Sequence, residues 1–281
     1  MSLRKDPDGR RWVQVEAEVP GTVEQVWAAI ATGEGVSSWF VPTEKREDGT
    51  VVSSFGPGME SVARQTAWDP PRRFAAESSV GGPDAPKMAT EWTLETRDGG
   101  TCVVRVVHSL FASNDDWDNQ LEAIEKGWPD YFAILSLYLK HFAGRPCSGV
   151  PLMSITTGTP AEAWEAVAGP LGLAGAGVGE RRESTGDAPR LAGVVERVGQ
   201  AGHPHQTLLR LDEPAPGLVH LFTMGMGGMT LVSVRFSCSA RTPGPTPRKP
   251  RPPGNPGWPA FSRNPPPPRP RPAEGPIAGP L

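Results

Sequence analysis

The sequence predicts an α+β fold in which a curved antiparallel sheet of seven strands wraps around one long helix. Three observations predict it. Between Asp118 and Phe142, apolar residues recur every three or four positions and, from Pro129 onward, also occupy much of the opposite face, as in a buried helix. Upstream, short segments of alternating polarity follow one another between turn residues. Such a sheet buries its concave face by wrapping around the helix.

The long helix has one dense apolar face and two features that modify it. Gly127 and Pro129 interrupt its middle, and because proline removes a backbone donor and clashes with the preceding turn, we expect a bend near Trp128. Asp116 precedes the helix, where a carboxylate caps and stabilises the N-terminus. The apolar face consists of Leu121, Ile124, Trp128, Phe132, Leu135, Leu139 and Phe142.

The elements before this helix follow from local patterns. Alternation predicts a half-buried strand at residues 12–19. Thr22 and Gln25 then form a capping-box pattern that begins a short helix, and a second helical turn follows at residues 36–40. Asp48-Gly49 is a strong hairpin signal. Further strands are predicted at residues 43–47, 50–55, 59–68, 72–78, 87–97 and 101–109.

Five short motifs in this order resemble a known family. They are Val19-Pro20 with the helix that carries Trp27, Trp39-Phe40, Trp68-Asp69-Pro70-Pro71, Glu91-Trp92-Thr93-Leu94 and Gly127-Trp128. The arrangement resembles the helix-grip fold of the START/Bet v 1-like (SRPBCC) superfamily. Within it, the chain is most similar to the group named after the C-terminal domain of the heat-shock-protein-90 ATPase activator. The resemblance covers residues 10–142.

Beyond Gly144 the same pattern begins again. Thr159 corresponds to Thr22 and Trp164 to Trp27, and strands are predicted at residues 152–157, 191–198, 206–211, 218–224 and 229–238. We interpret this part as a degenerate second helix-grip copy, because no long apolar helix follows its last strand. The predicted domains are a flexible N-terminus at 1–10, a helix-grip domain at 11–144, the second copy at 150–238 and a disordered tail at 239–281.

The tail is rich in proline and basic. Residues 241–281 contain 16 prolines and five glycines, and a segment with so few aliphatic residues cannot offset the entropy of ordering. Three interpretations stay open: a solvated tail, a ligand for proline-reading modules at Pro265–Pro272, or a reading frame shifted after Cys238.

Charge and cysteine content restrict the classes of binding partner and the cellular location that we expect. The tail has seven basic residues and one acidic residue, a net of +6, so a total of −3 leaves −9 for residues 1–240. An acidic body disfavours specific nucleic-acid binding. No apolar run is long enough for a membrane span. Three widely separated cysteines, Cys102, Cys147 and Cys238, fit reduced thiols, so we predict a cytoplasmic protein.

A helix-grip fold implies a cavity between the sheet and the long helix. Such a site is mostly apolar with a few polar groups, and the same side chains can instead fill the space as core. We expect Trp39 and Phe40 near one mouth of the cavity. The predicted ligand-binding residues are Trp39, Phe40, Trp92, Trp128, Phe132, Leu135 and Leu139.

Residues for chemistry are scarce. His108 is a weak candidate for a catalytic base, since a single histidine on a strand is more often packed and hydrogen-bonded. Glu91 and Arg105 are expected to pair across neighbouring strands, with little energetic weight. His203-Pro204-His205 supplies too few ligands for zinc. We therefore predict no metal and no cofactor.

Three functions remain open. The leading hypothesis is non-catalytic binding of a hydrophobic small molecule or a protein partner in the cavity. The second is a cyclase-like or hydrolase-like enzyme that uses the same cavity, with His108 or a carboxylate moving a proton. The third, which the family resemblance implies, is a chaperone-linked interaction domain.

Overall fold

The computed structural model describes residues 3–56, 58–79, 86–112, 115–145, 147–200 and 203–239. These residues form two compact units, which divide between Gly144 and Arg145. Each unit combines an antiparallel sheet with one or more helices, so the predicted α+β fold is confirmed. Apart from Ser239, which ends the last strand, the predicted tail lies outside the described residues.

The first unit is an eight-stranded sheet with strand order β1-β2-β8-β7-β6-β5-β4-β3. Seven of these strands correspond to the predicted ones, and the short β1 lies within the segment for which the sequence predicts flexibility. The elements are β1 (Arg4–Lys5), β2 (Arg10–Pro20), α1 (Val23–Ala31), α2 (Gly33–Trp39), β3 (Thr43–Lys45), β4 (Thr50–Ser54), β5 (Glu60–Asp69), β6 (Arg73–Ser79), β7 (Lys87–Arg97), β8 (Thr101–Phe111) and α3 (Asp118–Phe142).

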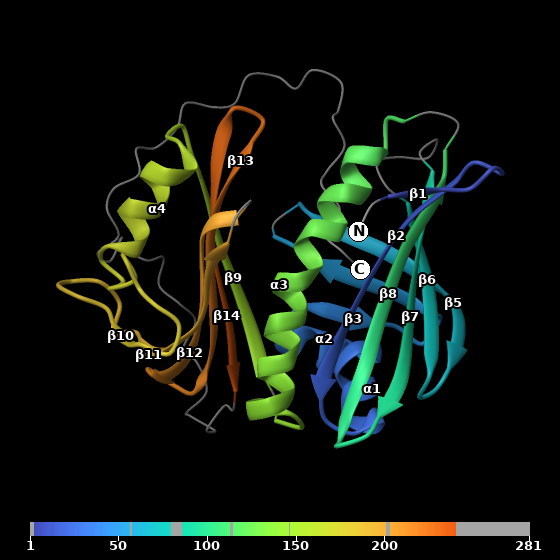
Figure 1. Cartoon of the computed structure of the whole chain (residues 1–281), viewed down its shortest axis with the longest axis horizontal. Coiled ribbons are helices and arrows are strands. Elements are labelled where there is room, and N and C mark those ends of the chain that lie inside the picture. Colours follow the sequence, from blue (N-terminus) through green and yellow to red (C-terminus); the bar gives the residue numbers. More distant parts are fainter. Residues whose placement is uncertain are drawn as a thin grey trace. The chain divides into compact units, whose positions relative to one another are not determined.

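The core of the first unit lies between α3 and one face of this sheet (Figure 1). Alternate residues of β8 point to this face, and Val104, Val106 and His108 are fully buried. From α3, the side chains of Trp128 and Leu135 are equally inaccessible. The helix continues unbroken past Pro129, with the predicted bounds. The central relationship predicted from sequence, a buried helix held by the sheet, is therefore confirmed.

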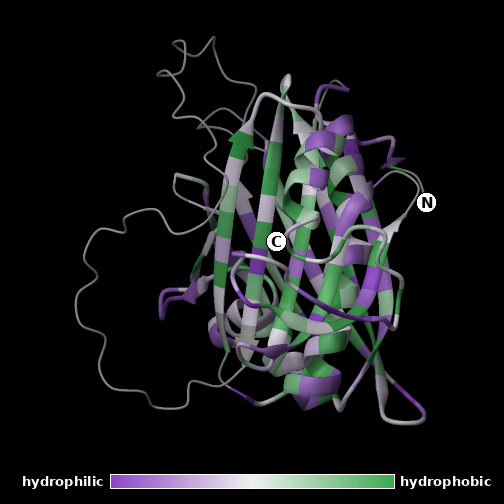
Figure 2. Ribbon diagram, turned by 90° about the vertical axis from the view of Figure 1, so that its left-hand side faces the viewer, coloured by the Kyte–Doolittle hydropathy of each residue, from purple (hydrophilic) through white to green (hydrophobic). Residues whose placement is uncertain are grey.

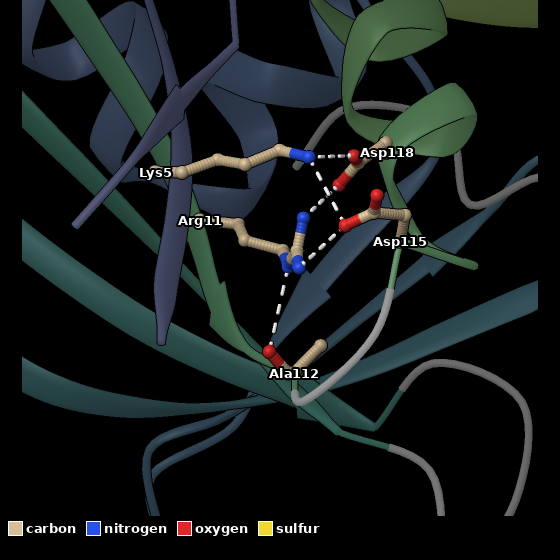
Figure 3. A network of polar contacts seen from close by, with 5 residues as sticks. All are labelled: Lys5, Arg11, Ala112, Asp115 and Asp118. Atoms are coloured by element: carbon tan, nitrogen blue, oxygen red, sulfur yellow. Dashed lines mark hydrogen bonds and ion pairs between the residues drawn. The ribbon is translucent and has the colours of Figure 1, made fainter. Parts of the chain in front are cut away.

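Ion pairs attach the start of α3 to the edge of the sheet (Figure 3). Arg11, on β2, donates to Asp118 at 2.6 Å and pairs with Asp115 at 2.8 Å. Lys5, on β1, pairs with Asp115 at 3.0 Å and with Asp118 at 2.6 Å. The N-cap of α3 is Trp117, without a side-chain cap, so the expected cap at Asp116 is wrong.

Two short helices cover the other end of the sheet. The capping box of Thr22 and Gln25 begins α1 as predicted, and Thr32 caps α2 by accepting from the Gly35 amide. A Cβ atom at Gly35 would lie 1.9 Å from the carbonyl oxygen of Ala28. Only glycine therefore allows α2 to pack this closely against α1.

The predicted pair of Glu91 and Arg105 is wrong. In the register of β7 and β8, Arg105 lies opposite Thr93, whereas Glu91 lies opposite Val107. Arg105 instead pairs with Glu16 on β2 at 3.0 Å, and Glu91 pairs with Arg73 on β6. The register of the strands decided the partners, since only neighbouring positions on one face come within reach.

The second unit repeats the strand order of the first. Its six-stranded sheet has the order β10-β11-β12-β13-β14-β9, so its first strand pairs with its last, as β2 pairs with β8. The capping box of Thr159 and Glu162 begins its helix. Its elements are β9 (Cys147–Thr156), α4 (Pro160–Ala168), β10 (Arg181–Glu183), β11 (Ala192–Gln200), β12 (His203–Glu213), β13 (Gly217–Met226) and β14 (Met229–Ser239).

The hydrophobic core of the second unit lies between α4 and one face of its sheet. Val167 packs there with Val195, Leu221 and Val234, and hydrophobic and hydrophilic residues are interspersed along the strands (Figure 2). The described residues end with β14 at Ser239, so the predicted lack of a long helix after this strand stays a prediction. None of the helices in the described part of the chain is long and apolar enough to cross a membrane.

Candidate functional site

The first unit contains a cavity beneath α2. Its volume is about 70 Å³, which accommodates a few water molecules or one small organic group. Sites that enclose a drug-sized ligand measure roughly 300–1,000 Å³. The cavity is lined by Ile30, Ala31, Thr32, Gly33, Val36, Trp39, Phe40, Thr43, Lys45, Val51, Ala63, Gln65, Trp68, Phe74, Ala75, Ala76, Ser78, Thr90 and Trp92.

The helix α2 forms one wall of this cavity and is held in place by its own side chains. Val36, one turn before the end of α2, lines the cavity while keeping part of its surface accessible. Trp39 is buried and donates from its indole Nε1 to the carbonyl oxygen of Ala29 at 3.0 Å. Phe40 ends the helix, and its ring lies 6.0 Å from the ring of Trp128. The wall is therefore anchored both to α1 and to the core.

Three aromatic side chains from the sheet form a second wall. Phe74, on β6, stacks against Trp92, on β7, with ring centres 5.9 Å apart and an angle of 11° between the planes. Trp68, on β5, lies 6.2 Å from Phe74. Register places these residues together, because Phe74 lies opposite both Trp68 and Trp92. Such a surface suits a planar, apolar ligand.

A single charged residue lines the cavity among those that the structure describes. Lys45, on β3, places its ammonium nitrogen 3.3 Å from the centre of the Trp68 ring, a cation–π contact. Partial burial lowers the pKa of Lys45 below its usual value. Gln65, on β5, contributes an amide to the same lining.

The hydroxyl groups of the lining are largely engaged. Thr32 donates to the Ala28 carbonyl at 2.7 Å, and Thr43 donates to the Val41 carbonyl at 2.9 Å. No aspartate, glutamate, histidine or cysteine is among the described residues that line the cavity. The described part of the chain also holds no group of three such side chains that could bind a metal ion. The lining therefore offers apolar surface and hydrogen-bond donors, without a carboxylate–histidine pair.

The structure places the predicted ligand-binding residues in two groups. Trp39, Phe40 and Trp92 line the cavity. The residues of α3 are not among those that line it: Trp128, Phe132, Leu135 and Leu139 are at most 7% exposed and pack in the core. Trp128 lies edge-on to Trp92 with ring centres 5.0 Å apart. Large side chains thus fill the space beside the long helix, and the empty volume lies further out, under α2.

Sequence reasoning missed Trp68, Phe74 and Lys45 as lining residues. A signal existed for Trp68, which belongs to the Trp68-Asp69-Pro70-Pro71 motif. Phe74 and Lys45 follow ordinary strand patterns, and their roles depend on the neighbours that folding supplies.

His108 is not among the described residues that line the cavity, but it lies directly behind one of them, Thr90. His108 is fully buried, and burial lowers its pKa to about 3, so the ring is neutral at physiological pH. Thr90 contacts one ring nitrogen and Trp128 the other. Both polar atoms of the ring are therefore used in packing the core.

Comparisons with known proteins agree with this picture of the first unit. Residues 20–140 match the sequence model of the family described as Activator of Hsp90 ATPase homolog 1-like protein. This match confirms the resemblance that the sequence motifs indicate. A search of the curated proteins finds no match to the chain.

Solved structures similar to the chain include one- and two-domain proteins. DynU16, from the dynemicin biosynthetic locus, is 21% identical with a TM-score of 0.40, over 82% of this chain and 87% of that one. The di-domain ARO/CYC BexL from the BE-7585A biosynthetic pathway is 15% identical with a TM-score of 0.42, over 82% and 85%. Aha1 from Colwellia psychrerythraea is 17% identical with a TM-score of 0.38, over 46% and 96%. These likenesses are too distant to indicate a function.

Proposed function

Because the first unit belongs to the START/Bet v 1-like superfamily and has an aromatic cavity under α2, we propose that it binds a small hydrophobic molecule there without transforming it. The observation that carries the proposal is the cavity itself, which α2 and the sheet enclose with Trp39, Phe40, Trp68 and Trp92. Binding of an apolar ligand to such a surface removes apolar area from water, which is favourable.

Two features support binding rather than catalysis. The described lining residues include no carboxylate and no histidine, which are common general acids and bases. His108, the histidine that the sequence offers as a base, is fully buried. The cytoplasmic location inferred from the separated cysteines remains a prediction.

Native mass spectrometry of the freshly purified full chain tests the proposal, together with ligand-observed NMR using a set of one-ring aromatic compounds. We expect a retained molecule or binding of several compounds from the set. Val36→Phe puts a ring into the cavity from a half-buried position. This variant should therefore retain no molecule and bind none of the compounds.

Val62→Phe is the matched control. Val62 is 57% exposed on β5 and is not among the residues that line the cavity, so the same change there should leave binding intact. If wild-type protein retains nothing and binds none of the compounds, or if Val36→Phe binds them as well as wild type does, the proposal is wrong.

A further inference from the structure

The charge of Lys45 is not balanced by any side chain that the structure describes. Its ammonium group forms no ion pair or hydrogen bond with the described residues, and its contact is the ring of Trp68. The acidic residue next to it, Glu44, pairs with Arg46 at 3.0 Å. Since side chains alternate along a strand, that pair lies on the opposite face from Lys45. Among the described lining residues, Lys45 thus supplies the one charged group of the cavity.

Most other basic residues near the sheet of this unit behave differently. Arg73 pairs with Glu91, and Arg105 with Glu16. Lys5 and Arg11 share Asp115 and Asp118 (Figure 3). A partly desolvated cation without an anionic partner carries a cost that a bound anion would remove. The lowered pKa of Lys45 is consistent with that cost.

A second polar group lies on the same face. Lys45 is opposite Val51, and Val51 is opposite Ala63, so the three residues form a row across β3, β4 and β5. Gln65 is two residues beyond Ala63 and therefore points to the same side. All four line the cavity. The side-chain amide of Gln65 makes no hydrogen bond to the described residues and can donate to a ligand oxygen.

Building on the proposed function, we propose that the ligand is a small aromatic carboxylate whose acid group binds Lys45, with Gln65 as a further donor. Its ring would lie against the aromatic wall of Trp68, Phe74 and Trp92. The limited cavity volume of about 70 Å³ favours a single ring. Charge selects the acid, and the flat apolar wall selects the ring.

The test compares phenylacetate with its neutral amide, phenylacetamide, by ligand-observed NMR on the full chain at pH 7. Because a charge-assisted hydrogen bond strengthens binding of the acid alone, wild-type protein should bind phenylacetate about tenfold more tightly than the amide. Lys45→Met keeps an alkyl side chain against Trp68 and removes the charge. This variant should bind phenylacetate and phenylacetamide with about equal affinity, because it loses affinity for the acid while its affinity for the amide is unchanged.

Lys87→Met is the matched control, because Lys87 is exposed on β7 and is not among the lining residues. This variant should keep the preference of wild type for the acid. Thermal unfolding of each variant verifies that it is folded.

The outcomes separate this inference from the proposed function. Equal affinity of wild type for the acid and the amide, or an unchanged preference in Lys45→Met, would overturn the carboxylate assignment and leave binding in the cavity standing. If neither compound binds, and the wider set of neutral aromatic compounds also fails, both ideas are wrong.

Discussion

The indole Nε1 of Trp128 donates a hydrogen bond of 2.8 Å to Nε2 of His108. The two ring planes are 22° from parallel, with centres 5.7 Å apart. Because Nε2 accepts this bond, the proton of the neutral imidazole lies on Nδ1, which donates to Thr90 Oγ1 at 3.0 Å. A chain of three buried side chains thus links α3 to β8 and β7. It fixes the rotation of the long helix against the sheet, which apolar packing alone specifies less strictly.

Trp128→Phe should destabilise the first unit by about 2 kcal/mol, because it leaves a buried histidine nitrogen without a donor and removes part of a packed ring. Urea unfolding followed by far-UV circular dichroism measures the change. Trp12→Phe provides a comparison, since the Trp12 indole donates to Asp6 at 3.2 Å in a less buried place. Trp12→Phe should lower the free energy of unfolding clearly less than Trp128→Phe does. Equal effects of the two changes would show that the buried bond is unimportant.

The stability of the first unit should fall as the solution is acidified below pH 6.5. Burial lowers the pKa of His108 from 6.5 to about 3 in the folded chain, so between these values the unfolded chain binds the proton first. The stability that the neutral His108 contributes is therefore fully present above pH 6.5 and is lost as the pH falls toward 3. Between pH 7 and pH 5 the loss should be about 2 kcal/mol.

His108→Gln isolates this contribution, because it removes the titrating group. The free energy of unfolding of the variant, measured in urea at several pH values, should depend on pH less steeply than that of wild type. The difference between the two slopes should correspond to one proton bound on unfolding. His220, in the second unit, also has its pKa lowered to about 3, mainly by burial, and cancels in this comparison. Trp128→Phe keeps His108 and should keep the steep dependence. An unchanged slope in His108→Gln would contradict the prediction.

The ion pairs at the start of α3 should be coupled energetically. Arg11 and Asp118 have side chains that are 10% and 16% exposed and lie 2.6 Å apart, a more enclosed setting than that of most surface pairs. Arg11→Met and Asp118→Asn should each lower the melting temperature by a few degrees. The double variant should lose less than the sum of the two, because both changes break the same interaction.

Salt provides an independent check on this coupling. Raising the ionic strength to about 1 M should reduce the difference between wild type and Arg11→Met, since screening weakens partly accessible ion pairs. Strictly additive effects in the double variant, with no influence of salt, would mean that these residues act through packing alone.

Local patterns were sufficient for most elements of the fold, although they did not predict the short strands β1 and β10. The bounds of α3 match the predicted helix, and the capping box at Thr22 begins α1 as predicted. Both signals depend on residues within one or two turns of each other. The same reasoning placed the cavity beside α3, where Trp128 and Phe132 instead pack in the core. Whether side chains fill a space or leave it empty depends on residues from distant elements, which periodicity does not describe.

The amino-acid sequence by itself determined the order and type of most elements, the buried helix and the repeat of the pattern in the second unit, because periodicity and capping are properties of neighbouring residues. Only the tertiary structure decided that Glu91 binds Arg73 rather than Arg105, and that Lys45 lines a cavity whose described lining residues include no carboxylate. The physical reason is that strand register and helix packing set which side chains meet, and a shift of one residue would change every partner.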